Sequence, residues 1–352
     1  MVGRAVRYAV IDAFTDTPFK GNPAAVCFLE DGQQVDDEWM QSVAKEFNIS
    51  QTAFLTRAVS GDNPRFHLRW FTPVEEVDLC GHATLAAAHF LLSFGLVKCD
   101  IIEFVTKSGI LTASKVSGIT SGGKNENLVK CNREKDNFSI ELNLPMCKVV
   151  ECDSGEVPSI PETLNGASVI NVQKKVSTAD LLVEVTSGLD VVNLKPNFDE
   201  IQKCAGRGII ITGSAPSGSG YDFFSRFFCP KLGINEDPVC GSAHCALAPY
   251  WSKKLGKHNL IAYMASPRGG RLDLTLDENA ERLYIRGEAV TIDAFTDTPF
   301  KGNPAAICFL EDGQQVDDEW MQEWSHQSRT REAKSVLRLN FVVTLLEERK
   351  RG

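Results

Sequence analysis

Two three-residue stretches of this chain have the composition of an acid–base site. Cys80-Gly81-His82 and Cys240-Gly241-Ser242 each place a thiol, a glycine and a polar side chain at the start of a run with helical character. The start of a helix presents unpaired N–H groups and a positive dipole end, which attract a carboxylate or an enolate oxygen. Glycine at such a point lets a ligand approach the backbone closely. We therefore expect Gly81, Gly241 and Ser242 to bind substrate.

The two thiols are the candidate acid and base. A cysteine at a helix start can have its pKa lowered from about 8.5 into the range of roughly 3.5–7.5. If Cys80 and Cys240 face each other across a cleft, one removes a proton from one face of a carbon atom and the other supplies a proton to the opposite face. That is the chemistry of a racemase that needs no cofactor. The alternative is that both are small buried apolar side chains, as free cysteine commonly is.

Polar residues near the two thiols extend the candidate site, and each also has a purely structural interpretation. His82 and Asp237 either bind substrate or shuttle protons, or they bond the local backbone and stiffen an Asp-Pro turn. Ser242 is a helix N-cap, with or without a ligand contact. Asn22 is either a turn residue or part of the cleft lining. Arg268, in a glycine-rich loop, is expected to be solvated surface.

Hydrophobic periodicity predicts the elements that position these residues. Strands are expected at 8–14, 24–29, 53–56, 65–71, 101–111 and 223–228. Helices are expected at 36–47, at 83–96 and from about residue 243. The helix at 83–96 is apolar nearly all round, which is typical of a helix buried in the middle of a domain. Pro249 lies inside the last helix and should kink or break it.

Composition limits the classes of function. The chain of 352 residues has a net charge of −9, which argues against a nucleic-acid partner. It contains no apolar run of about 20 residues and no secretory h-region, so we expect no membrane association and a cytoplasmic location. Its 11 cysteines are an odd number without a CxxC pair, which indicates reduced thiols and no metal site. No dinucleotide or phosphate-binding fingerprint is present, so no cofactor is expected.

The remaining cysteines show no partner pattern, and we expect them to be structural. They are Cys27, Cys99, Cys131, Cys147, Cys152, Cys204, Cys229, Cys245 and Cys308.

The domain organisation follows from composition and from one internal repeat. We expect a first domain at 1–120, a polar linker at 121–137 and a second domain at 138–291. Residues 292–322 repeat residues 11–41 with one change, Val26 to Ile307. Repeats that stack on one another recur every ~20–50 residues, so a copy this far away indicates a duplication or fused gene rather than an architectural repeat. Residues 323–352 form a tail outside the expected fold.

Several long motifs then make the sequence recognisable. DAFTDTPFKGNPAAV, RWFTPVEEVDLCGHAT and SRFFCPKLGINEDPVCGSAH, together with SPRGG at 266–270, resemble the phenazine-biosynthesis isomerase-like family, which has the diaminopimelate epimerase fold. The resemblance runs from about residue 8 to 290. It implies an α+β protein of two pseudo-symmetric domains, each a curled sheet around a central helix, with the active site between them. It also implies a last short strand, here 289–295, that returns to the first domain.

The resemblance carries over some catalytic roles and not others. In the phenazine enzyme a Glu after the Ser of an N-x-S-E motif shuttles the proton, and the His of GHA and the Asp of EDP assist; these two correspond to His82 and Asp237. The backbone and Ser of GSA bind the substrate carboxylate. Here Gln51 stands in place of the Glu. An amide cannot act as a general base, although Gln51 can still hydrogen-bond a ligand.

Cysteine is retained at both positions that the epimerase branch of the fold uses, Cys80 and Cys240. The resemblance and the thiol pair together predict a cofactor-independent isomerase or epimerase acting on a small carboxylate-containing metabolite. The sequence leaves the oligomeric state open, with a homodimer as one candidate. The alternative is a catalytically inactive relative that binds a small acid or a protein partner. The missing Glu favours that alternative, and the retained thiols disfavour it.

We predict that residues 292–352 are a fusion or gene-model artefact without a catalytic role, because two nearly identical segments compete for one place in the sheet. The native protein should then have a smaller mass than the 38.7 kDa of the full chain. Intact mass spectrometry of the protein from its natural source measures this directly, and a species of full mass would contradict the prediction.

Overall fold

The computed structural model describes residues 6–30, 35–59, 63–118, 138–152 and 163–292. The first half of the chain forms a curled sheet in the order β1-β2-β3-β4-β6-β7-β8. Neighbouring strands are antiparallel except the pairs β2–β3 and β4–β6, which are parallel. The strands are β1 (Arg7–Ala13), β2 (Asn22–Leu29), β3 (Gln51–Arg57), β4 (Arg65–Phe71), β6 (Ile101–Thr106), β7 (Gly109–Ser117) and β8 (Phe138–Pro145), with the short β5 (Glu76–Val77) beside β4.

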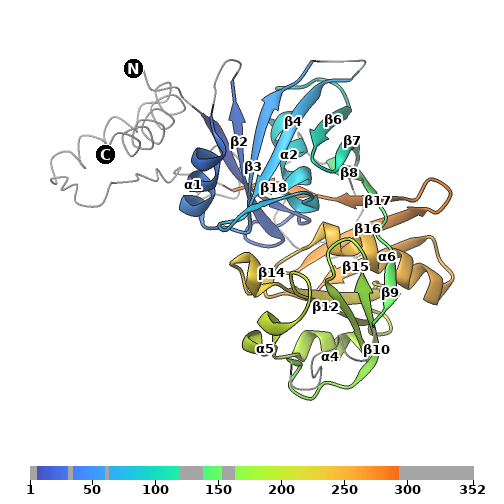
Figure 1. Ribbon diagram of the computed structural model, residues 1–352. Coiled ribbons are helices and arrows are strands. Elements are labelled where there is room, and N and C mark those ends of the chain that lie inside the picture. The colour runs from blue at the N-terminus through green and yellow to red at the C-terminus, as the bar shows by residue number, and fades with distance from the viewer. Residues whose placement is uncertain (1–5, 31–34, 60–62, 119–137, 153–162, 293–352) are drawn as a thin grey trace, which may run out of the picture.

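The second half repeats this arrangement in the order β10-β11-β12-β13-β15-β16-β17. Again only two pairs are parallel, β11–β12 and β13–β15, and a two-residue strand, β14 (Glu236–Asp237), lies beside β13. The strands are β10 (Val169–Lys175), β11 (Leu181–Val185), β12 (Ile209–Ser214), β13 (Phe223–Phe228), β15 (Asn259–Met264), β16 (Gly270–Asp277) and β17 (Arg282–Gly287). The matching order and directions confirm the predicted α+β fold of two pseudo-symmetric domains (Figure 1).

The two domains exchange their last strands. β9 (Val149–Glu151) follows β8 but pairs with β10 of the second domain, and β18 (Ala289–Thr291) follows β17 but pairs with β1 of the first. β8 and β17 pair with each other and join the two sheets. The predicted returning strand is therefore present in the part of 289–295 that the structure describes. The copy at 292–322 and the tail at 323–352 lie outside the described residues, apart from Ile292.

The predicted linker at 121–137 lies in a different place in the fold than expected. It falls between β7 and β8, which pair with each other, with Ser117 opposite Phe138. The chain changes domain later, between β8 and β9. Polar composition misled the prediction because the connection within a hairpin is as polar as a linker between domains.

Helix α1 (Asp37–Phe47) packs on the outer face of the first sheet. Asp36 caps its start by accepting a hydrogen bond from the Trp39 amide at 2.8 Å, and Asn48 ends it in the left-handed region. Trp39 and Met40 pack with Phe54 in a separate apolar cluster. The smaller helices α4 (Gly188–Asn193), α5 (Phe198–Lys203) and η1 (Pro230–Leu232) belong to the second domain.

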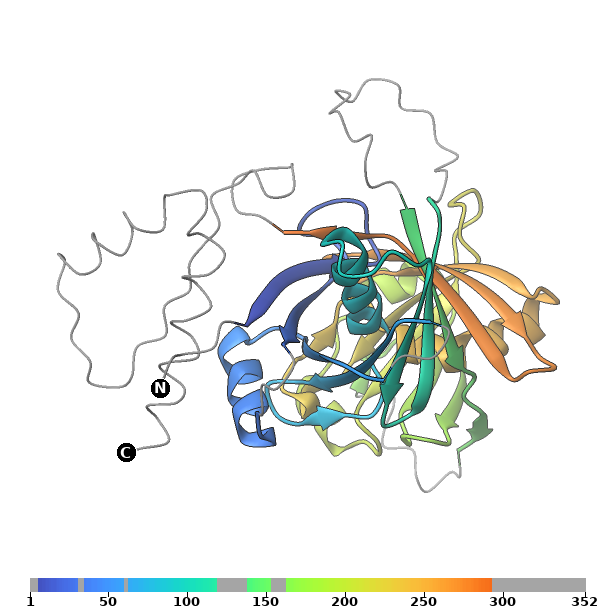
Figure 2. The same cartoon turned by 90° about the horizontal axis from the view of Figure 1, so that it is seen from above.

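The central helices are α2 (Gly81–Ser93) in the first domain and α6 (Gly241–Leu255) in the second. The strands of the first domain curl around α2, as the view from above shows (Figure 2). Every residue of α2 from Gly81 to Leu91 is buried, as its uniformly apolar sequence predicts. None of the helices among the described residues is long and apolar enough to cross a membrane.

Helix α6 continues through Pro249 to Leu255, so the predicted break is absent. A proline inside a helix cannot donate to the carbonyl four residues before it, here that of Cys245. The amide of Cys147, in the crossover between β8 and β9, donates to this carbonyl at 2.8 Å. The crossover thus supplies the hydrogen bond that Pro249 removes.

A loop of the second domain holds the first domain in place. Arg268 was expected to be solvated, but its side chain is only 31% exposed and its Nη2 lies 2.6 Å from Oδ1 of the buried Asp12. Its Nε donates to the carbonyl of Gly21 at 2.9 Å, and the Gly21 amide donates to Gly269 at 2.9 Å. Gly21 has φ +63°, and a Cβ there would lie 2.2 Å from the Ala13 carbonyl oxygen. The position therefore requires glycine.

Replacement of Arg268 by alanine should lower the free energy of unfolding by roughly 2–4 kcal/mol at neutral pH, because it leaves the Asp12 carboxylate buried without a cation. Burial already raises the pKa of Asp12. The loss should therefore shrink as the pH falls and Asp12 becomes protonated. Urea unfolding at several pH values measures this.

Arg271→Ala is the matched control, since Arg271 pairs within its own strand with Asp273, which is one-quarter exposed. It should cost at most about 1 kcal/mol. The double variant Asp12→Asn/Arg268→Ala should be more stable than Arg268→Ala alone. An equal or lower stability of the double variant would show that the buried charge is not the cause.

Candidate functional site

The two central helices begin against each other, one from each domain. A Cβ on Gly81 would lie 2.9 Å from the Cα of Gly241, and a Cβ on Gly241 would lie 3.0 Å from the Cα of Gly81. Both positions therefore need glycine. The residues just before them, Cys80 and Cys240, are the N-cap residues of α2 and α6, and neither thiol caps its helix. The contact brings the two cysteine–glycine steps to one place between the domains.

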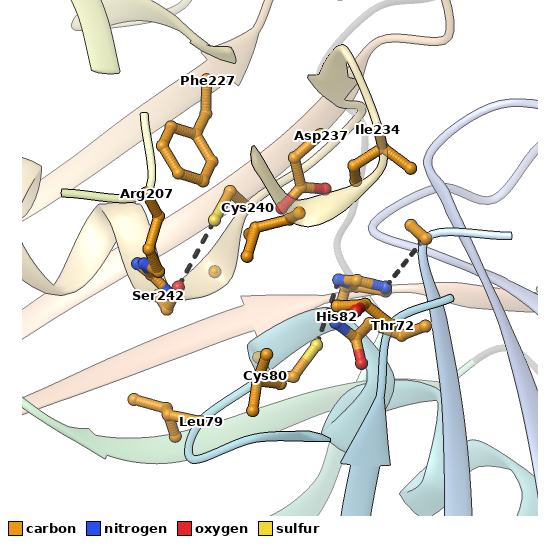
Figure 3. Close-up of a pocket in the computed structure, with 16 residues that line it drawn as sticks. Thr72, Leu79, Cys80, His82, Arg207, Phe227, Ile234, Asp237, Cys240 and Ser242 are labelled. Atoms are coloured by element: carbon orange, nitrogen blue, oxygen red, sulfur yellow. Dashed lines mark hydrogen bonds between the residues drawn. The ribbon is translucent and has the colours of Figure 1, made fainter. Parts of the chain in front are cut away.

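A small cavity lies where the helices meet (Figure 3). All the predicted site residues except Asn22 line it: Gln51, Cys80, Gly81, His82, Asp237, Cys240, Gly241 and Ser242. Its free volume is about 30 Å³. That is close to the volume of one water molecule in the liquid. A substrate therefore needs the lining side chains or the two domains to move apart.

A second, larger hollow of about 910 Å³ lies on the first domain beside α1 and β4. None of the predicted site residues lines it, and it joins no thiol to a base. Its size alone does not make it the site.

Asn22 lies behind the cavity and connects groups from both domains. It is fully buried, and its Nδ2 lies 3.0 Å from Nδ1 of His82. The same amide nitrogen donates to the carboxylate of Asp237 and to the carbonyl of Val239 in the second domain. Its Oδ1 accepts from the hydroxyl of Ser50 at 2.6 Å. Asn22 thus positions His82 and Asp237 and does not line the cavity, unlike the predicted substrate contact.

His82 is held as a neutral imidazole. Burial lowers its pKa to about 3. The hydroxyl of Ser50 donates to Oδ1 of Asn22, so Nε2 of His82 carries the ring proton and donates to Oγ of Ser50 at 3.2 Å, which leaves Nδ1 as the acceptor. The thiol of Cys80 lies 3.4 Å from the same Nδ1 and can donate to it. The imidazole thus bonds side chains of the site, not the local backbone.

The thiols do not have the low pKa values expected of a helix start. Burial raises the pKa of Cys80 well above its ordinary value, although the amide of Ala83 acts in the opposite direction. Burial and the nearby Asp237 carboxylate raise the pKa of Cys240 to about 12. Desolvation outweighs the helix dipole here, because both thiols are enclosed by the two domains. Both are protonated at neutral pH in the ligand-free protein.

Asp237 gives Cys240 a basic partner, as His82 does for Cys80. Burial raises the pKa of the Asp237 carboxyl, while hydrogen bonds from Cys240 and Asn22 act in the opposite direction. The Cys240 sulfur also lies 3.4 Å from Oγ of Ser242. Each domain thus contributes one thiol with one hydrogen-bonded base.

One charged residue of the site, Arg207, was missed by the sequence reasoning. It lies just before β12 and lines the cavity beside Phe227. Its Nη2 donates at 2.6 Å to the fully buried Asp180. The sequence around it offers no motif, because an arginine before an apolar strand is common on any surface.

The described part of the chain contains no cluster of three or more His, Cys, Asp or Glu side chains that would hold a metal ion.

Comparison with known proteins identifies the family to which the chain belongs. The family described as "Phenazine biosynthesis-like protein" matches residues 11–292, and again 292–340, a range that starts at the copy and continues into the tail. The chain belongs to this family. An uncharacterized isomerase of Halalkalibacterium halodurans is 44% identical over 284 residues, which cover 80% of this chain and 95% of the relative.

Solved structures give the same result. A phenazine biosynthesis protein of the PhzF family from Enterococcus faecalis is 36% identical and has a TM-score of 0.65, covering 82% of this chain and 97% of that one. A probable proline racemase from Agrobacterium radiobacter, at 11% identity and a TM-score of 0.53 over 84% of this chain and 94% of that one, shares the fold alone.

The raised thiol pKa values predict slow alkylation of the site at neutral pH. Iodoacetamide at pH 7 should label the exposed Cys99 much faster than Cys80 or Cys240, and labelling of Cys80 and Cys240 should accelerate as the pH rises, because only the thiolate reacts. Cys27, buried and with a pKa raised to about 12, is the internal control and should react as slowly. Peptide mass spectrometry over time measures each rate. Labelling of Cys80 or Cys240 as fast as Cys99 at pH 7 would contradict the assignment.

Proposed function

We propose that this protein is a cofactor-independent isomerase of the racemase or epimerase type, which moves a proton between the two faces of a carbon atom next to a carboxylate. One observation carries the proposal. Two buried thiols, one from each domain, line the same cavity at two facing helix starts, and each has its own basic neighbour. The relative named an isomerase supports the same reaction class.

The thiolate should arise at Cys240. Asp237, whose pKa is raised, is a stronger base than His82, whose pKa is about 3. In the proposed reaction the Cys240 proton passes to Asp237, and the Cys240 thiolate then removes the proton from the substrate carbon. The Cys80 thiol donates its proton to the opposite face of that carbon. Cys80 is left as the thiolate, and the reverse reaction runs through the same groups with the roles exchanged.

The helix starts supply the stabilisation that this step requires. When the substrate carbon loses its proton, negative charge moves onto the carboxylate oxygens. First-turn amide groups, which have no acceptor within their own helix, lie at Gly81 and His82 on one side and at Gly241 and Ser242 on the other. The cavity is too small for bulk water, so these donors act in a medium of low dielectric constant.

The free thiols fit a reducing compartment. No disulfide bond is present among the cysteines of the described residues, which supports the cytoplasm as the location in this proposal.

A binding protein without catalysis is the second candidate. Gln51 favours it, because an amide lines the cavity where the family resemblance places a proton-shuttling Glu. The two candidates differ in whether the protein exchanges a carbon-bound proton with solvent.

We predict that the protein catalyses deuterium uptake from heavy water at the α-carbon of at least one member of a panel of amino and hydroxy acids. Cys80→Ala and Cys240→Ala should each reduce the rate by about 10²–10⁴-fold, as loss of a general acid or base does. The rate should fall as the pH is lowered and Asp237, whose pKa is raised, becomes protonated, because Asp237 must accept the Cys240 proton. Proton NMR and mass spectrometry follow the exchange.

Cys229→Ala is the matched control, because Cys229 is fully buried nearby but does not line the cavity. It should retain the rate of the unmodified protein. Exchange that survives both site substitutions would end the thiol-pair mechanism, and absence of exchange from the whole panel would favour the binding candidate.

A further inference from the structure

Arg207 has a property that no other residue of the cavity shares. It is the one Lys or Arg side chain among the described residues that line the cavity, and His82, which also lines it, is neutral. The only other ionisable groups there are two thiols and the carboxyl of Asp237. A ligand in this cavity therefore meets positive charge from one direction only.

In the ion pair between Arg207 and Asp180, the guanidinium group lines the cavity and the carboxylate lies behind it. Asp180 is fully buried and does not line the cavity, while the side chain of Arg207 is 25% exposed and does. Asp180 accepts from Nε of Arg207 at 3.2 and 3.3 Å and from Nη2 at 2.6 Å. Nη1 has no acceptor within the described parts of the chain. The guanidinium group thus keeps donors for a ligand.

Asp180 also holds the backbone of Arg207. Its Oδ1 accepts from the Arg207 amide at 2.9 Å, and its Oδ2 accepts from Thr178 at 2.5 Å. Hydrogen bonds and the positive charge of Arg207 keep the pKa of Asp180 below its ordinary value. A carboxylate that fixes both the main chain and the side chain of one arginine leaves the guanidinium group little freedom. Such preorganisation reduces the entropy cost of binding an anion.

The first domain presents a different group to the same cavity. Gln51 is 6% exposed, lines the cavity, and its Oε1 has no hydrogen-bond partner. An unpaired buried amide oxygen is costly, so it marks a place where a ligand N–H or O–H fits. Apolar side chains such as Leu79, Phe227 and Ile234 complete the wall.

We infer that Arg207, positioned by Asp180, selects an anionic substrate and fixes its orientation, with the carboxylate toward the second domain and a hydroxyl or amino group toward Gln51. The substrate class is then a 2-hydroxy or 2-amino acid with a small apolar side chain. The inference rests on the proposed function for its meaning, but it concerns binding and not proton transfer, so it can be tested separately.

The test compares two probes that differ in charge and hardly in shape, 2-hydroxy-3-methylbutanoate and 2-hydroxy-3-methylbutanamide. Binding is measured by ligand-detected NMR and by the shift of Tm with probe concentration. Cys80→Ala, which should not turn over, serves as the parent protein. We expect the parent to bind the acid about 10- to 100-fold more tightly than the amide, the range for a charge-assisted hydrogen bond.

Arg207→Gln should abolish this preference. It should weaken binding of the acid and leave binding of the amide unchanged. Arg207→Lys should retain part of it, since the charge remains while the paired geometry is lost. Asp180→Asn should weaken binding of the acid, but by less than Arg207→Gln does. Arg271→Gln, outside the cavity, is the control and should keep the full preference.

Equal binding of acid and amide by the parent, no binding of the acid at tens of millimolar, or a full acid preference in Arg207→Gln would each overturn the inference. Preference for the acid that depends on Arg207, together with no deuterium exchange from any compound, would support the inference while refuting the proposed catalysis. The two proposals therefore fail separately.

Discussion

The contact between Gly81 and Gly241 is the constraint on which the site depends. Two helices from different domains begin with their backbones so close that neither position has room for a Cβ. This contact turns two ordinary helix starts into one site with first-turn donors on both sides. It also explains why the thiols, the imidazole and the carboxyl group are enclosed together. Any side chain at either glycine would separate the helices and open the cavity.

Because the two thiols are enclosed, their pKa values are raised, whereas a cysteine at a helix start usually has a lowered pKa. The dipole of α2 and the Ala83 amide favour a thiolate at Cys80, but loss of water costs the thiolate more. The resting protein therefore keeps both thiols protonated, each bonded to a base. Such a resting state limits reaction of the thiols with adventitious electrophiles.

The sequence predicted the fold, and it singled out eight of the residues that line the cavity, because local motifs mark helix starts and turns. Cys-Gly-polar steps before apolar helices, the Asp-Pro turn and Gly21-Asn22-Pro23 each point to a helix start or a turn. Hydrogen bonds and ion pairs between residues far apart in the sequence are not marked by any local motif. Asn22 reaches residues more than 200 positions away, and Arg268 pairs with Asp12 across the domain boundary. Arg207 was missed for the same reason, since its role comes from Asp180, which lies just before the neighbouring strand β11. The domain boundary was misplaced because composition does not reveal which strands pair.

The exchange of β9 and β18 has a consequence for synthesis on the ribosome. β1 is among the first described residues to emerge, yet its neighbour β18 lies some 280 positions later in the chain. The first domain therefore waits with one edge of its sheet unpaired while the entire second domain is made. Unpaired edges of this kind bind other strands readily. Translation order therefore leaves the edge of β1 open until residues 289–291 have been made.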